Sequence, residues 1–236
     1  DETQSRPASS EDQIKYVKTQ APLIQAPFQP GSTPTHFQQR FMVWNSVGLI
    51  MCYNTEIEKS INIEFHDSTV HHSIHIPNVQ NYSLADLSQD AVVFATNGDD
   101  IDVVSKLFCM VLSTFDSTKE WQIEMAKDEL IEALTLGNDF IAIATNRRFI
   151  RVFTIGGIQT QLFSIPGPVL CLASHENQLM IIYHNGSGIL DEQNLSMLLL
   201  KIDHKVSYVK QTTPNPFPIA LSEKSKVYWA GFTDEG

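Results

Sequence analysis

The sequence has few of the features that mark membrane-spanning, disulfide-rich and nucleic-acid-binding proteins. No apolar run approaches the roughly 18 residues that a bilayer-spanning helix needs, and only three of the 236 residues are cysteines. Lysines and arginines number 16 against 27 aspartates and glutamates, which gives a formal net charge of −11. Because affinity for a phosphate backbone comes from cationic side chains that displace counterions, the composition argues against extensive direct DNA binding and against a membrane location.

The three cysteines indicate a reducing compartment. Cys52, Cys109 and Cys171 each lie inside an apolar segment, and their number is odd. An odd number of cysteines within predicted strands favours buried free thiols over a disulfide framework. We therefore expect a soluble protein that is not secreted.

What the sequence does contain is a repeat of alternating strands. Three segments open in the same way, Ile131–Leu136, Val169–Ser174 and Phe217–Ser222, and an earlier copy begins at Leu84. Each opening is followed by a polar break and a second apolar strand. Strand repeats at a spacing of about 40 to 50 residues are typical of a β-propeller, so we predict an all-β fold of four-stranded blades.

The strands before the repeat fit one further blade. Arg40–Trp44 and Leu49–Tyr53 flank a turn-forming break at Asn45–Gly48, which predicts a hairpin. A third strand is expected at Ile61–Phe65. The alternating stretch His71–Ile76 could supply the fourth, outer strand.

The clearest blade runs from Ile131 to Pro166. Its first strands are continuously apolar, as expected of strands covered on both faces, whereas Ile158–Ile165 alternates like an outer strand with one wet face. The pair Gly156 and Gly157 predicts a tight turn before this outer strand, and it lacks the spacing of a nucleotide-binding loop.

One segment favours a helix by composition. Glu120–Leu134 is rich in strong helix formers. However, Trp121, Ile123 and Met125 follow the two-residue period of a strand, and the repeat requires an outer strand, a turn and an inner strand here. We therefore predict strands.

The repeat count predicts an incomplete ring. Residues 1–36 are rich in proline and polar residues, which predicts an irregular lead-in, and residues 37–236 are assigned to propeller blades. Phe217–Ser222 and Lys226–Gly231 are expected to be the first two strands of a fifth blade. A ring that stops there exposes sheet edges, so we expect the natural chain to continue or to be completed by another segment.

Candidate ligands and acids are present without a clear site. His66, His71, His72 and His75 cluster near Asp67, but histidines on opposite faces of a strand do not converge on a metal ion. We predict no metal and no cofactor.

The acidic pairs Asp99-Asp100 and Asp128-Glu129 lie in predicted turns, where carboxylates are normally solvated. Asp86 could line the central channel, yet one carboxylate does not make a glycosidase site. No catalytic residues are predicted.

For partner-facing positions we select His71, His72 and Trp121. The alternative for Trp121 is packing between blades.

A series of segments between Phe28 and the last residue resembles one known family, in the same order along the chain. They are Phe28–His36, Arg40–Gly48, Ile63–Asp67, His71-His72, Asn81–Ser88, Ser117–Trp121, Phe153–Gln159, Phe163–Val169 and Tyr183–Gly186. Together they resemble the middle, SepB-type domain of the family of WD-repeat and HMG-box DNA-binding proteins, also called acidic nucleoplasmic DNA-binding protein or chromosome transmission fidelity factor four.

This resemblance implies a non-catalytic nuclear scaffold for DNA replication and chromatid cohesion. It implies a homotrimer that links the replicative helicase, through GINS, to DNA polymerase alpha-primase. It also implies no small-molecule substrate. Peptide docking by the helical bundle of the family is not carried over to any residue of this sequence. Two alternatives stay open: an unrelated intracellular propeller that binds other proteins, and a propeller hydrolase with acidic side chains converging at the channel mouth.

Overall fold

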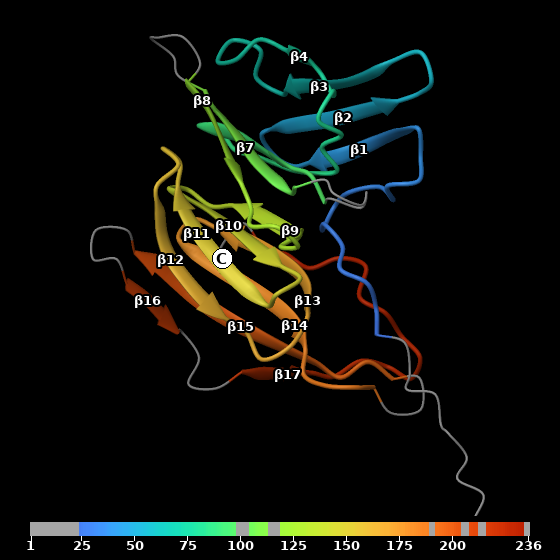
Figure 1. The fold of residues 1–236 in the computed structure, drawn as a ribbon, viewed down its shortest axis with the longest axis vertical. Coiled ribbons are helices and arrows are strands. Elements are labelled where there is room, and N and C mark those ends of the chain that lie inside the picture. The colour runs from blue at the N-terminus through green and yellow to red at the C-terminus, as the bar shows by residue number, and fades with distance from the viewer. Residues whose placement is uncertain are drawn as a thin grey trace, which may run out of the picture.

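The strands form four antiparallel sheets that succeed one another as blades (Figure 1). The computed structural model describes residues 24–97, 104–112, 119–188, 192–203, 208–211 and 216–233. None of these residues lies in a helix, so the described part of the chain contains no helix that could cross a membrane. The all-β prediction is confirmed, and the ring of blades is not closed.

Each blade is built from consecutive strands, with the first strand innermost. Blade 1 contains β1 (Gln39–Trp44), β2 (Gly48–Asn54), β3 (Lys59–Phe65) and β4 (Ile74–Pro77). Blade 2 contains β5 (Leu84–Leu87), β6 (Ala91–Ala95), β7 (Lys106–Val111) and β8 (Lys119–Glu124). Blade 3 contains β9 (Ile131–Leu136), β10 (Phe140–Thr145), β11 (Phe149–Thr154) and β12 (Gln159–Ser164). Blade 4 contains β13 (Val169–His175), β14 (Gln178–His184), β15 (Leu195–Asp203), β16 (Tyr208–Gln211) and β17 (Phe217–Ile219).

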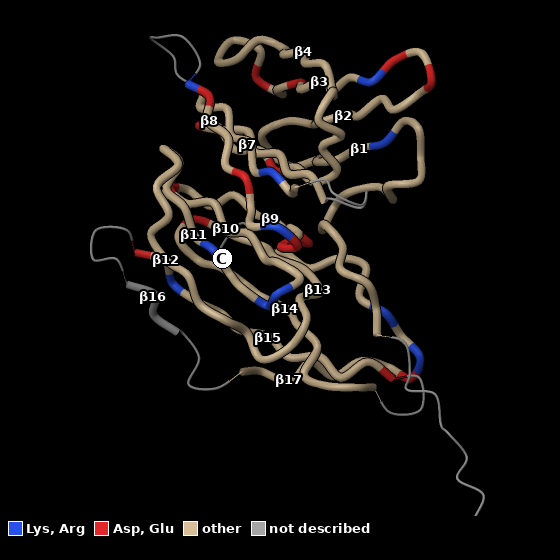
Figure 2. The backbone as a smooth tube through the Cα atoms, viewed as in Figure 1, with Lys and Arg blue, Asp and Glu red and all other residues tan. Residues whose placement is uncertain are grey.

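The continuously apolar strands are explained by burial on both faces. In β6, Val92 and Phe94 pack into the core shared with blade 1, while Val93 packs into the core shared with blade 3. In β10, Ile141 faces blade 2 and Ala142 faces blade 4. Because side chains alternate between the faces of a strand, one apolar run supplies two cores. β10, β13 and β14 accordingly contain no charged residue and are tan in Figure 2.

The segment with high helix propensity is confirmed as strands. β8 and β9 are separated by a turn in which Asp128 has a φ of 63°. In β8, Trp121 and Ile123 pack toward the core shared with blade 3 while Glu120 and Glu124 are exposed. Packing of one alternating face has outweighed helix propensity.

The predicted fifth blade is wrong. β17 begins where its inner strand was expected, but it pairs with Leu195–Met197 of β15 as an outer strand. β16 pairs with the other half of β15, so two short strands share the outer edge of blade 4. Pro218 suits an edge position because it has no N–H to donate.

The second predicted strand of that blade, Lys226–Gly231, is irregular. Its Val227 and Ala230, with Phe232, pack on a cluster of blade 4 that includes Leu170 and Met180. The apolar pattern that suggested an inner strand therefore serves to cover the free face of blade 4.

The described lead-in, residues 24–36, is irregular and lies against the inner strands. Gln29 pairs with Leu134 of β9: its Nε2 donates to the Leu134 carbonyl over 2.8 Å, and its Oε1 accepts from the Leu134 amide over 3.4 Å. The Phe28 amide donates to the Leu170 carbonyl over 2.9 Å. These bonds satisfy backbone groups on the edges of β9 and β13 that face the channel, where neither strand has a neighbouring strand in the described part of the chain.

A second glutamine joins the lead-in to the C-terminal segment. The Gln25 side chain donates to the Val227 carbonyl over 2.6 Å and accepts from the Val227 amide over 3.1 Å. The two segments run side by side in Figure 1. Segments far apart in the sequence are thus joined beside blade 4, on which both of them pack.

The three cysteines are free and buried, as predicted. Burial raises the pKa of Cys109 and of Cys171 to about 12. Both side chains are therefore neutral thiols at physiological pH.

Replacement of Gln29 tests the attachment of the lead-in. Gln29→Ala should lower the free energy of unfolding by about 1 to 3 kcal/mol, because it leaves the Leu134 amide and carbonyl without partners. Urea unfolding followed by tryptophan fluorescence measures the change. Gln80→Ala is the matched control, since that side chain is exposed. Equal effects of the two substitutions would contradict the attachment.

Candidate functional site

The ends of all four inner strands line one cavity. Its lining includes Trp44–Val47 from the end of β1 and the following turn, and likewise Leu87–Asp90 from β5, Leu136–Asn138 from β9 and Ser174–Glu176 from β13. The cavity has a volume of about 590 Å³. We call it the channel mouth.

Hydrogen bonds between neighbouring blades surround this mouth. Asn45, in the turn after β1, donates from Nδ2 to the Leu87 carbonyl of blade 2 over 2.7 Å. The same side chain accepts from the Val47 amide over 2.9 Å, which shapes its own turn. The Asn138 amide of blade 3 donates to the Glu176 carbonyl of blade 4 over 2.9 Å. The turns after β1 and β9 are thereby each bonded to the next blade.

Asp86 makes the central connection, from blade 2 to blade 3. Its Oδ2 accepts from the Leu136 amide over 2.8 Å and from the Thr135 hydroxyl over 3.3 Å, while its Oδ1 accepts from the Leu87 amide over 2.8 Å. The Thr135 and Ser174 hydroxyl oxygens are 2.8 Å apart, which extends the chain of bonds to blade 4. Burial raises the pKa of Asp86 to about 6, and the three donors partly oppose that rise.

The mouth is acidic and partly aromatic. Asp86, Asp90 and Glu176 line it, and no lysine or arginine is found among the described residues of its lining. Trp44 and Trp229 also line it, and they are 61% and 64% exposed. The prediction that Asp86 lines the central channel is confirmed, and the residue lies on the inner strand β5. The sequence analysis missed the other four residues, Trp44, Asp90, Glu176 and Trp229. Their positions at or just after the ends of the first strands of the blades, or in the C-terminal segment, were visible in the sequence.

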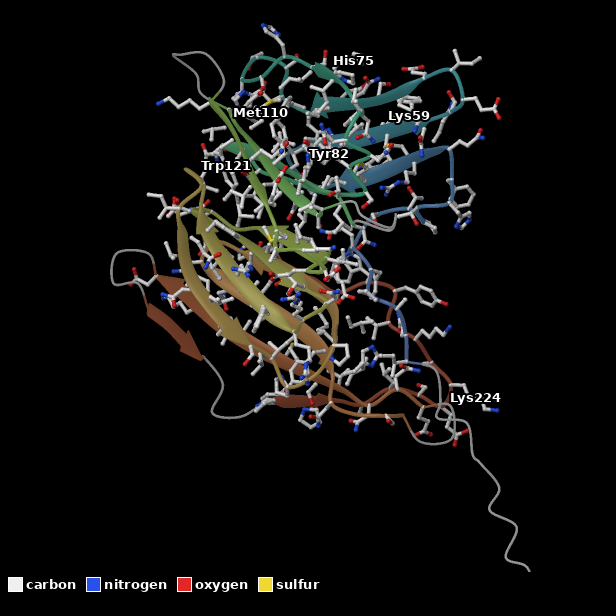
Figure 3. All side chains as sticks on the ribbon, in the orientation of Figure 1. Lys59, His75, Tyr82, Met110, Trp121 and Lys224 are labelled. Atoms are coloured by element: carbon white, nitrogen blue, oxygen red, sulfur yellow. The ribbon has the colours of Figure 1, made fainter. Side chains whose placement is uncertain are left out.

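Trp121 packs between two blades. Its indole N–H donates to the Ile155 carbonyl over 2.8 Å, and its ring lies 6.4 Å from that of Phe153. Gly157, with a φ of 90°, passes under the indole ring: a Cβ there would lie 3.0 Å from it. Figure 3 shows Trp121 on the blade 2 side of this junction. The packing alternative is thus present in the structure, and a role in partner binding stays a prediction.

The selected histidines lie on blade 1, away from Trp121. β4 begins only at Ile74, so the predicted outer strand starts too early and His71 and His72 lie in the preceding loop. His71 Nε2 is 2.9 Å from the Gln89 carbonyl, and its ring is 4.9 Å from that of Phe65. His72 is exposed. Their contact with a partner stays a prediction.

The histidines do not converge. His75 bonds to Asn62 through Nδ1, and His66 bonds to the Asn45 carbonyl through Nε2 over 3.0 Å. Within the described ranges, no three His, Cys, Asp or Glu side chains are grouped as metal ligands.

In the acidic turn pair Asp128-Glu129, Asp128 is exposed as predicted, but Glu129 is not solvated. Glu129 is buried and accepts both Nε and Nη2 of Arg151, at 2.9 and 2.8 Å. The bonds from Arg151 lower the pKa of Glu129. The turn before β9 brings this carboxylate over blade 3, where a cation on β11 compensates its burial. Asp99 and Asp100 lie outside the described residues.

Comparisons with known proteins identify relatives over most of the chain. The family model described as "Minichromosome loss protein, Mcl1, middle region" matches residues 26–236. WD repeat and HMG-box DNA-binding protein 1 of Xenopus laevis is 47% identical over 212 residues, and its counterpart in Homo sapiens is 45% identical over 212 residues. Both alignments cover 90% of this chain and 18% of the relative.

A more distant relative carries the name of the family. Minichromosome loss protein 1 of Schizosaccharomyces pombe is 23% identical over 166 residues, which cover 69% of this chain and 20% of that protein. The chain thus spans about a fifth of the length of these relatives. None of the three names describes an enzyme.

The pH dependence of stability tests whether burial raises the pKa of Asp86. Its folded pKa of about 6 lies above the ordinary value of 3.8, so protonation favours the folded state. The stability contributed by this group is greatest below pH 4 and is lost as pH rises toward 6. Between pH 4 and pH 7, the free energy of unfolding of wild type should fall by up to about 3 kcal/mol relative to that of Asp86→Asn.

Urea unfolding of both proteins across this pH range measures the difference. Glu129 is present in both proteins, so its contribution to the pH dependence of stability cancels. Asp139→Asn, a substitution of an exposed residue in the next turn, should retain the wild-type dependence. A constant difference between wild type and Asp86→Asn would contradict the assignment.

Proposed function

The chain belongs to the family of the middle region of minichromosome loss protein, Mcl1, and from this premise we propose that it is a non-catalytic scaffold domain of the replisome. The names of its relatives, which refer to DNA binding and minichromosome loss, support a role in chromosome replication. The bonds of Asp86 support the absence of catalysis, because its carboxylate connects two blades. We also assign the domain to the nucleus, because the names of its relatives refer to DNA binding and to chromosomes.

The scaffold acts as a homotrimeric hub that links GINS, on the replicative helicase, to DNA polymerase alpha-primase. Three copies of a rigid domain hold several weak partners at one place, and the effective concentration of each partner rises accordingly. The net charge of −11 supports contacts with proteins over direct contacts with DNA. The chain spans about a fifth of its relatives, so other parts of the full-length protein contribute to these contacts.

The outer edge of blade 3 is our candidate for the contact between copies. Ile158, just before β12, is 69% exposed, and Leu162 in β12 is 49% exposed. The outer strand β8 instead exposes charged side chains such as Glu120 and Glu124. An exposed apolar edge is a favourable surface for association because its burial removes apolar area from water.

Light scattering of the purified chain tests the trimer. The expected mass is three times the 26.5 kDa of one copy. Leu162→Lys should shift the mass to that of a monomer, whereas Ile57→Lys, at a side chain that is 99% exposed on blade 1, should remain trimeric. A wild-type monomer at every concentration would count against the hub. A Leu162→Lys trimer would move the contact to another surface.

Binding of partners is tested with the full-length protein. Purified GINS and polymerase alpha-primase should each co-elute with it, and one complex should contain both. Absence of both from the eluted protein would contradict the replisome assignment.

A further inference from the structure

The channel mouth carries negative charge without a counter-charge. Asp86, Asp90 and Glu176 line the cavity, and in the described part of the chain none of them forms an ion pair. Asp90 and Glu176 are exposed, so their charge is available to a solute that enters the mouth. Glu176 holds the turn after β13 with a φ of 48°, and its carbonyl is bonded to Asn138. Its position is therefore fixed by the backbone.

Two tryptophans accompany these carboxylates. Trp44 ends β1 and Trp229 lies in the C-terminal segment, and both are more than half exposed. The Trp44 ring is held by a contact with Phe41 at 5.0 Å. Tryptophan faces attract lysine and arginine side chains, and nearby carboxylates add to this attraction. The cavity therefore combines two features that favour a cationic guest.

An irregular peptide already occupies the neighbouring part of the channel. Gln29, Pro30 and Gly31 line the same cavity, and Gln29 bonds to the backbone of Leu134. The free edge of an inner strand thus both donates to and accepts from the side-chain amide of an irregular segment. A peptide is consequently a better fit than a compact ion.

We propose that the channel mouth binds a basic peptide segment of a partner protein, with an arginine or lysine side chain held by Trp44, Trp229, Asp90 and Glu176. The net charge of −11 draws such a segment toward the domain. Binding at the mouth needs one copy of the chain. It is thus separate from the trimer and from the contacts proposed at the outer blade edges.

Fluorescence anisotropy with a short fluorescein-labelled peptide of alternating arginine and alanine tests this site. Glu176→Gln and Trp229→Ala should each weaken binding about two- to fivefold, the range of exposed cation–π and ion-pair contacts. The double variant should weaken it by about the product of the two factors. A labelled peptide of alternating glutamate and alanine should not bind.

Two matched controls separate the mouth from general charge attraction. Glu64→Gln removes an exposed carboxylate on β3, and Tyr228→Ala removes an exposed ring next to Trp229 that does not line the cavity. Both should bind the peptide as wild type does. Equal weakening by Glu64→Gln and Glu176→Gln, unchanged binding in Trp229→Ala, or no binding by wild type would each overturn the proposal. Urea unfolding midpoints equal to wild type show that the variants are folded.

Discussion

The structure depends on how each blade is joined to the next. Apolar cores fill the space between neighbouring sheets. Apolar contact has no direction, however, and does not by itself set the angle between blades. The hydrogen bonds of Asp86 supply direction, because its carboxylate meets the Leu136 amide and the Thr135 hydroxyl of the neighbouring inner strand. Ser174 then continues the chain of bonds to blade 4. Blades 2, 3 and 4 are thereby held in register around the channel.

The same bonds determine what the channel mouth presents. Once the inner strands are fixed, the turns that follow them gather around one cavity and carry Asp90, Glu176 and Trp44 with them. The inner edges of those strands retain backbone groups without strand partners, and the lead-in satisfies two of them through Gln29. A surface suited to peptides therefore follows from the architecture.

Much of the fold was predictable because blade strands have a strong period. The two-sided burial of β6 and β10 appears as continuous apolar runs, and the one-sided burial of β8 and β12 appears as alternation. The pattern failed at Phe217, where an apolar segment covers blade 4 without forming a blade of its own. It also failed at Glu129, since the partner Arg151 is distant in sequence. The mouth was largely missed for the same reason: only the ring arrangement brings its four turns together.

Hydrogen exchange at the amide of Leu136 tests the role of Asp86 most directly. Leu136 ends its strand next to a turn, where amides ordinarily exchange quickly, and its N–H is bonded to the Asp86 carboxylate. If this bond joins blades 2 and 3, the Leu136 amide will exchange as slowly as the amides of the buried strand β10, and Asp86→Ala will expose it selectively. Rapid exchange in wild type, or exchange unaffected by the substitution, would show that the blades are held together without Asp86.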